Sequence, residues 1–197
     1  MTNLDITLFY LINRDSANVI FDTIMPAITA RGYLLVLPYL FYLLYLGGLF
    51  SHKESRKYLA SAIWAVLIAI CAAPLAEWAG HIIKDYVARV RPCHVVDGVR
   101  LLVNCPDSLS MPSGHSVSSF AVSIPLFYLT RRYVSLPWRL YPLFLAAAIA
   151  FSRVYVGVHY PSDVIVGAGL GGALSGMLCI VYYFAYLKRK EKPHEER

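Results

Sequence analysis

The stretch SRVYVGVHYPSD (residues 152–163) stands directly before the uncharged apolar run VIVGAGLGGALSGMLCIVYYFAYL (residues 164–187). A helix needs about 20 predominantly apolar residues to cross a bilayer, so this run is long enough to span one. Charged side chains are costly beside a membrane unless they face a protein interior or a wet cavity. The placement of Arg153, His159 and Asp163 at this junction therefore predicts a membrane helix that begins at a functional site.

Composition places the whole chain among integral membrane proteins. Of its 197 residues, 58% are hydrophobic and 15% are charged, whereas soluble domains carry about 25% charged residues. This length predicts a single domain over residues 1–197. The net charge of +6 is divided among short loops and the C-terminal tail, without a basic amphipathic stretch. That distribution excludes a nucleic-acid-binding protein.

The predicted fold class is all-α, a polytopic membrane helical bundle with about five transmembrane helices and short N-terminal interfacial helices. The expected spans are residues 33–50, 58–80, 112–130, 140–151 and 162–187. Residues 1–31 contain two apolar pieces, 4–12 and 19–28, which are too short to span and predict interfacial helices. A sixth span over residues 17–30 is the alternative, although Asp22 and Pro26 interrupt it.

Basic residues predict the orientation of these spans. They are concentrated in the loop 51–57, in the loop after Thr130 and in the tail 188–197. Since cytoplasmic loops are enriched in lysine and arginine, this side is expected to be cytoplasmic, and so is the C-terminus. The N-terminus and the polar segments discussed below then lie on the outer side. Residues 1–15 lack the basic start and the apolar length of a cleavable signal peptide.

Two cysteines, Cys93 and Cys105, flank one polar loop on the predicted outer side. In an oxidising compartment they could form a local disulfide, and the alternative is a pair of free thiols. The chain has no cysteine and histidine spacing typical of a zinc site.

Lys84 and Arg91 are the first candidates for binding an anion. Phosphoryl transfer needs positive charge around the phosphate oxygens. Their spacing of seven residues predicts one helix face, two turns apart, and Pro92 is expected to end that helix. Glu77 and His81 fall on the same predicted face, as supports for Lys84 or as part of an entrance. The alternative for the two cations is interfacial snorkelling. The alternative for Glu77 and His81 is a structural polar pair at the membrane boundary.

A second candidate segment is Pro112-Ser113-Gly114-His115, which is typical of a helix start. Free N–H groups and the helix dipole favour an anion there, and Gly114 leaves room for its close approach. His115 is placed to exchange a proton with a bound leaving group. The alternative is a capped helix start with a structural histidine.

The third segment joins Arg153 to His159 and Asp163, which follow it by six and ten residues. A carboxylate bound to one imidazole nitrogen holds the tautomer and stabilises a cation formed at the other nitrogen. This arrangement makes His159 a candidate nucleophile. The alternative is a buried histidine paired with a helix-start aspartate.

Together, the three segments resemble the signature motifs of the type 2 phosphatidic acid phosphatase (PAP2) family. The matching patterns are Lys84-x6-Arg91-Pro92, Pro112-Ser113-Gly114-His115 and Ser152-Arg153-x5-His159-x3-Asp163. The resemblance implies that His159 attacks phosphorus, that Asp163 orients it and that His115 protonates the leaving oxygen. It also implies a phosphate site without metal or other cofactor, formed by Lys84, Arg91, Ser113, Gly114 and Arg153.

The resemblance implies a lipid phosphate as the partner of this site, in a bacterial-type inner membrane with the active site on the periplasmic face. The short N-terminal region and the span order are similar to undecaprenyl diphosphate phosphatases of the bacitracin-resistance type. Phosphatidylglycerophosphate, phosphatidate and the 1-phosphate of lipid A are alternative substrates. A vanadium haloperoxidase and a non-enzymatic lipid-binding or transport protein are the other classes. The sequence predicts no oligomeric state.

Overall fold

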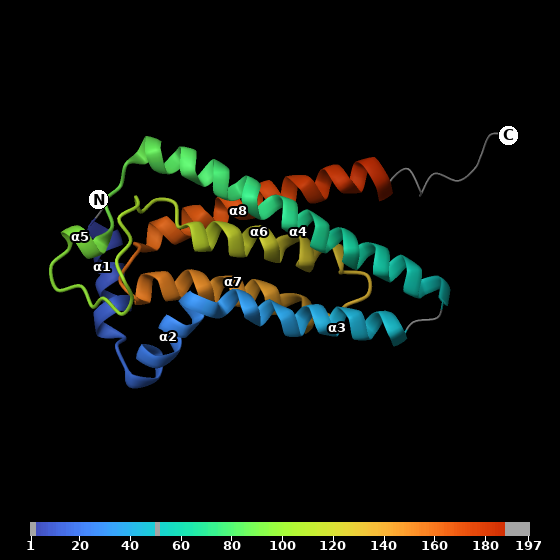
Figure 1. The fold of residues 1–197 in the computed structure, drawn as a ribbon, viewed down its shortest axis with the longest axis horizontal. Helices are drawn as coiled ribbons and strands as arrows, with labels where there is room; N and C mark the ends of the chain where they lie inside the picture. Colours follow the sequence, from blue (N-terminus) through green and yellow to red (C-terminus); the bar gives the residue numbers. More distant parts are fainter. Residues whose placement is uncertain (1–2, 50–51, 188–197) are drawn as a thin grey trace.

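The computed structural model describes residues 3–49 and 52–187, and 79% of it is helix, without strands in these residues. Its long helices run side by side as an elongated bundle (Figure 1). In chain order the elements are α1 (Asn3–Tyr10), η1 (Leu11–Asp15), α2 (Val19–Arg31), η2 (Gly32–Leu35), α3 (Val36–Leu49), α4 (His52–Val87), α5 (Pro92–Val95), α6 (Gly114–Leu129), α7 (Leu136–Tyr155), α8 (Pro161–Tyr182) and η3 (Tyr183–Leu187). The predicted all-α class is therefore confirmed, whereas the tail 188–197 lies outside the described residues.

Three segments of the described chain are long and apolar enough to cross a membrane: Val19–Gly48, Arg56–Val95 and Pro161–Ala185. They contain α2 with α3, α4, and α8. Helices α6 and α7, which correspond to the third and fourth predicted spans, pack against them. These apolar helices indicate that the chain is a membrane protein, and the number of spans stays a prediction.

Small residues on α8 let this helix pack closely on α6. A Cβ atom added at Gly167 would lie 2.8 Å from the Ser113 carbonyl oxygen, and one at Gly171 would collide with the Val117 carbonyl oxygen. A Cβ at Gly176, by contrast, would meet no atom within 4 Å. Close packing thus depends on the first half of α8, which is the half that begins at residues 161–163.

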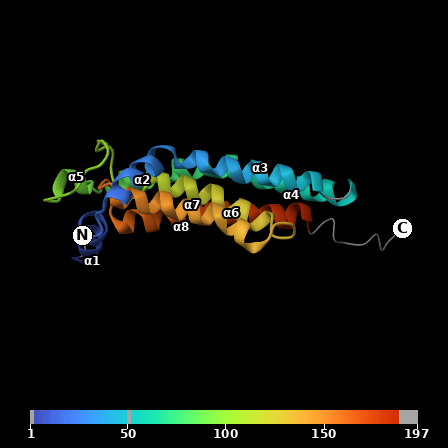
Figure 2. The same cartoon turned by 90° about the horizontal axis from the view of Figure 1, so that it is seen from below.

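The N-terminal elements dock against one end of the bundle. Figures 1 and 2 show α1, α2 and α5 gathered there, at the end opposite the α6–α7 connection. Asn13 is fully buried and donates from its amide to the carbonyls of Arg100 and Tyr155, at 2.8 and 2.7 Å. Arg100 in turn forms a 2.6 Å ion pair with Asp22 of α2. Residues 3–31 are therefore tied to the loops at this end through Asn13 and Asp22.

The end of α4 corrects one expectation. The helix runs from His52 to Val87, which extends beyond both ends of the predicted span 58–80, but it stops before Arg91 and Pro92, where the helix was expected to end. Ala88 adopts the left-handed conformation (φ 49°), and its N–H still bonds the Lys84 carbonyl at 2.8 Å. Lys84 and Arg91 therefore do not share one helix face. Pro92 also begins a helix, α5, because its fixed φ suits the first helical position.

Candidate active site

The three polar segments of the sequence meet at the end of the bundle where α4 stops and α6 and α8 start. The Ser113 N–H donates to the Asp163 carbonyl oxygen at 3.0 Å, which joins the starts of α6 and α8. The Lys84 ammonium donates to the Leu109 carbonyl at 3.1 Å and so ties the end of α4 to the loop before α6. His115 is the second residue of α6 and follows the Ser113–Asp163 junction by two residues.

His159 lies at the centre of this region, with only 2% of its surface exposed. Its Nδ1 lies 3.3 Å from Oδ2 of Asp163, which also accepts from the Tyr160 N–H at 2.8 Å and from the Ser110 hydroxyl. A carboxylate at this position favours the tautomer with the proton on Nδ1, which leaves a lone pair on Nε2. Burial lowers the pKa of His159 well below its ordinary value. The imidazole is therefore neutral near pH 7, as a nucleophile must be.

Arg91 covers the other nitrogen of this imidazole. Its Nη1 lies 2.8 Å from His159 Nε2 and donates to the Val158 carbonyl at 3.0 Å. The rest of the guanidinium donates to Ser108, through Nε to the carbonyl at 2.6 Å and through Nη2 to the hydroxyl at 3.0 Å. The loop before α6 thus holds a cation at the atom that would attack.

Arg153 and Ser113 present buried polar atoms that have no partner in the described part of the chain. Arg153 is 6% exposed, and its Nη1 donates to the Thr29 hydroxyl at 3.1 Å, while its Nε is unsatisfied. The fully buried Ser113 hydroxyl is also unsatisfied. Buried donors normally find partners, so such atoms are expected where a ligand binds. A Cβ at Gly114 would meet no atom within 4 Å, which leaves space beside them.

His115 opens onto a cavity of about 280 Å³ whose wall is mostly apolar. Helices α2, α3, α4, α6 and α7 supply that wall, and Glu77 accepts a hydrogen bond from the Ser118 hydroxyl within it. The lining residues are Ile28, Thr29, Tyr33, Val36, Glu77, His115, Ser118, Ser119, Val122, Ser123, Pro142, Leu145, Ala146 and Ile149. Glu77 therefore lines this cavity, and its role there stays a prediction.

Sequence reasoning missed several residues that position this site. Ser108 and Ser110 hold Arg91 and Asp163, and Arg89 donates to Asp163 Oδ1 at 2.7 Å. Serines in a loop carry no spacing that distinguishes them from other loop serines. Only the nearness of Ser108 and Ser110 to the segment that begins at Pro112 could have drawn attention to them.

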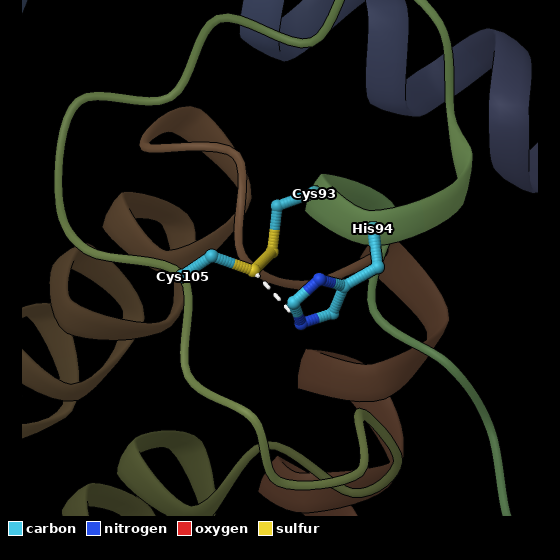
Figure 3. A group of neighbouring side chains, drawn as sticks. All are labelled: Cys93, His94 and Cys105. Atoms are coloured by element: carbon cyan, nitrogen blue, oxygen red, sulfur yellow. Dashed lines mark hydrogen bonds between the residues drawn. A yellow bond between two sulfur atoms is a disulfide. The ribbon is translucent and has the colours of Figure 1, made fainter.

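Cys93 and Cys105 are joined in a disulfide that closes the loop between Arg91 and Ser108 (Figure 3). His94 lies beside it, with Nε2 3.2 Å from the Cys105 sulfur and 3.2 Å from the Pro106 carbonyl oxygen. The ligand atoms of the three residues are within 4.8 Å of one another. Zinc needs thiolates, however, and the disulfide uses both sulfurs. Cys93 and Cys105 therefore form a covalent cross-link within the loop and not a zinc site.

Comparison with known proteins agrees with this geometry. Residues 59–189 match the family model described as "PAP2 superfamily". Over 112 residues the chain is 38% identical to the decaprenylphosphoryl-5-phosphoribose phosphatase of Mycobacterium tuberculosis, which covers 57% of this chain and 58% of that protein. It is 32% identical over 123 residues to an undecaprenyl-diphosphatase of Sulfolobus acidocaldarius, covering 62% of this chain and 54% of the relative. The chain thus spans less than two thirds of these curated relatives.

A solved structure has the same fold over nearly the whole chain. The crystal structure of Aquifex aeolicus LpxE superposes with a TM-score of 0.66, covering 91% of this chain and 96% of that one. The two chains are 24% identical, so the similarity concerns the fold alone. The family resemblance drawn from the three motifs is confirmed by the family match, which includes all of them.

Proposed function

The chain belongs to the PAP2 superfamily, and from this premise we propose that it is a membrane lipid phosphatase that works through a phosphohistidine intermediate. One observation carries the proposal. Neutral His159 is bound by Asp163 at Nδ1 and has Nε2 beside Arg91, next to buried donors that lack partners. This is the arrangement of an oriented nucleophile at an anion site.

In the proposed first step, His159 Nε2 attacks the terminal phosphorus, and the bond from that phosphorus to the oxygen of the departing lipid phosphate (or lipid alcohol, for a monophosphate) breaks. His115 gives its proton to the departing oxygen. Asp163 stabilises the positive charge that the imidazole acquires. In the second step, His115 takes a proton from water, whose oxygen attacks phosphorus and releases inorganic phosphate and free His159.

The positive charge that this transition state needs comes from side chains of the protein. Lys84, Arg91 and Arg153 would bind the phosphate oxygens, together with the Ser113 hydroxyl and the Gly114 N–H. Arg91 contacts His159 Nε2 in this structure, so it would exchange this contact for a phosphate oxygen when substrate binds. Such preorganised donors stabilise charge in a site that excludes water.

The apolar cavity beside His115 supports a lipid substrate, since a hydrocarbon chain fits its wall and the phosphate would remain at the polar end. We propose undecaprenyl diphosphate as the leading substrate. The names of both curated relatives specify polyprenyl phosphates, and the phosphate site itself distinguishes little between lipids. Phosphatidylglycerophosphate, phosphatidate and lipid A 1-phosphate are the alternatives.

The proposal includes a membrane arrangement. Five spans, with α1 and α2 at the interface, would place the site on the periplasmic face of a bacterial-type inner membrane and the tail 188–197 in the cytoplasm. The disulfide between Cys93 and Cys105 supports this orientation, because disulfides persist in oxidising compartments.

The test is phosphate release by the detergent-purified protein from a panel of the four lipids, with a chelator present. We expect release from the wild type and a loss of about a thousandfold or more in His159→Ala. His81→Ala, which changes an exposed histidine of α4 outside the cavity, is the matched control and should retain full activity.

Acid-labile phosphate bound to the wild-type protein, and absent in His159→Ala, would identify the intermediate. Release that survives the His159→Ala change would remove the proposed nucleophile. No release from any lipid by folded protein would favour the non-enzymatic class, and halide oxidation with vanadate would favour the haloperoxidase class.

A further inference from the structure

Asp163 is held from two sides. Its Oδ2 faces His159, Ser110 and the Tyr160 N–H, whereas its Oδ1 accepts from Arg89 Nη1 at 2.7 Å. The carboxylate is fully buried and the Arg89 side chain is 13% exposed. The charge of Asp163 is therefore shared between the imidazole that would react and a cation on the side away from it.

Arg89 is held between two parts of the fold. It follows Ala88, whose left-handed conformation comes directly after the last residue of α4. The Arg89 carbonyl then accepts from the Ser110 N–H at 2.8 Å, and its guanidinium lies 3.9 Å from the centre of the Tyr160 ring. Arg89 is therefore held through its backbone by the loop before α6 and through its side chain by Tyr160, directly before α8.

The second partner of Arg89 comes from the N-terminal helix. Asp5 of α1 is 7% exposed and forms an ion pair with Arg89 Nη2. The same carboxylate accepts from the Ser162 N–H at 3.0 Å and from its hydroxyl at 2.6 Å. Ser162 also accepts from Arg89 Nη1 at 2.6 Å. Helix α1 is thereby fastened to the first turn of α8, one residue before Asp163.

The charges of these groups explain why two acids are needed. With Arg89 alone beside it, Asp163 would be neutralised and would stabilise an imidazolium poorly. With Asp5 on the far side of Arg89, the three groups carry a net charge of −1. Opposite charges close together in a buried site interact strongly, so the added carboxylate leaves Asp163 oriented by Arg89 and still effectively negative toward His159.

We propose that Arg89 and Asp5 are positioning residues for the reaction, which set the orientation and the effective charge of Asp163. This inference deepens the proposed function and rests on it. It makes helix α1 part of the active site, although α1 carries none of the three motifs and lies outside residues 59–189 of the family match.

The experiment compares Arg89→Gln, Asp5→Asn and the double variant with the wild type, by kcat and KM for phosphate release from undecaprenyl diphosphate. Residues that orient a reacting group through one intermediate typically contribute about 10- to 100-fold. We expect kcat to fall by about that factor in each single variant, with KM changed less than about threefold. The double variant should be no slower than Arg89→Gln, because Asp5 acts through Arg89.

The matched control is the ion pair between Arg100 and Asp22, which also ties the N-terminal segment to a loop. Its Arg100 Nη2 and Asp22 Oδ2 atoms are 2.6 Å apart. Arg100→Gln and Asp22→Asn remove an ion pair of the same kind without touching Asp163. If the ion pairs affect kcat only by docking the N-terminal segment, removing either pair will lower kcat equally, and the proposal is then wrong. Arg89→Lys should recover part of the activity because it keeps the charge.

A second measurement needs no lipid substrate. Orthovanadate mimics phosphate, and its affinity for the purified protein depends on an oriented His159. We expect Arg89→Gln and Asp5→Asn to weaken vanadate binding about tenfold and Arg100→Gln to leave it unchanged. If the wild type binds vanadate but releases no phosphate, the proposed function fails while the positioning pair is still tested. Unchanged vanadate affinity and unchanged kcat in Asp5→Asn would overturn the pair, even if Arg89→Gln does not fold.

Discussion

The two ends of the helical bundle differ in the charge of their buried polar groups. At the end where α6 and α8 start, five ionisable side chains are less than a tenth exposed: Asp5, Arg91, Arg153, His159 and Asp163. At the opposite end, the fully buried hydroxyls of Tyr58 and Thr130 are neutral and bonded within the fold, although the Nε atom of the partly buried Arg139 has no partner in the described chain. The Tyr58 hydroxyl donates to the Leu43 carbonyl at 2.6 Å, and the Thr130 hydroxyl to the Leu126 carbonyl at 2.6 Å.

This difference separates what holds the bundle together from what binds a ligand. Neutral hydroxyls bonded to carbonyls stabilise a helix end at modest cost, because both partners are satisfied. Buried charges are costly unless they are paired. At the site end they are paired with one another, and the Ser113 hydroxyl and Arg153 Nε remain unsatisfied. Substitutions at the site end should therefore lower activity more than stability, and substitutions at the opposite end should lower stability more than activity.

The largest expected effect is on activity at the site end. Asp163→Asn removes the negative charge that would stabilise the imidazolium while nearly preserving volume. We expect kcat for phosphate release to fall by about a thousandfold to ten-thousandfold. The melting temperature should change far less than activity, which a thermal shift in detergent will show. A fall in kcat of less than tenfold would contradict the orienting role.

A second change tests the region between the two ends. At Gly171→Ala the new Cβ would collide with the Val117 carbonyl oxygen and lie 3.0 Å from the Ala121 N atom. Overpacking of this kind costs about 1–3 kcal/mol. We expect a lower melting temperature, and reduced activity because the starts of α6 and α8 carry the site.

Gly176→Ala, five residues further along the same helix, is the control for this change. Its Cβ would meet no atom within 4 Å, and alanine favours a helix over glycine by about 1 kcal/mol. Equal destabilisation by the two substitutions would show that close packing at Gly171 is not what matters.

The pH dependence of stability should reflect the site end. Burial lowers the pKa of His159, so below its unfolded value of about 6.5 the unfolded state binds a proton that the folded state does not. The contribution of His159 to the free energy of unfolding should therefore be largest near pH 7, and it should decrease as the pH drops below about 6.5. We expect melting temperatures of the wild type to fall more between pH 7 and pH 5 than those of His159→Asn. Parallel curves would contradict the neutral, buried state of His159.

The smallest expected effect is at the opposite end. Tyr58→Phe removes the hydroxyl that bonds the Leu43 carbonyl and leaves the ring in place. The net loss should be about 1 kcal/mol of stability, with kcat and KM unchanged. A change in kcat would mean that the two ends are coupled through the helices, and the comparison between them would then fail.

Much of the site could be predicted because its chemistry requires particular residue types at particular helix starts. The structure brings His115, His159 and Asp163 to one end of the bundle, and their roles there stay predictions. The relation of Lys84 to Arg91 was predicted wrongly. The two residues have helical spacing in the sequence, but α4 ends at Val87 and Ala88 takes a left-handed conformation that this spacing does not reveal.

The sequence by itself determined the helical class, the family and the chemical candidates, because apolar length and motif spacing are local properties of the chain. Only the tertiary structure decided which charges meet. The pairing of Asp5 with Arg89 and the support of Asp163 by Ser110 join segments that are distant along the chain. No local pattern encodes such contacts. They follow from how α1, the loop before α6 and the start of α8 pack at one end of the bundle, where each buried charge must find a partner.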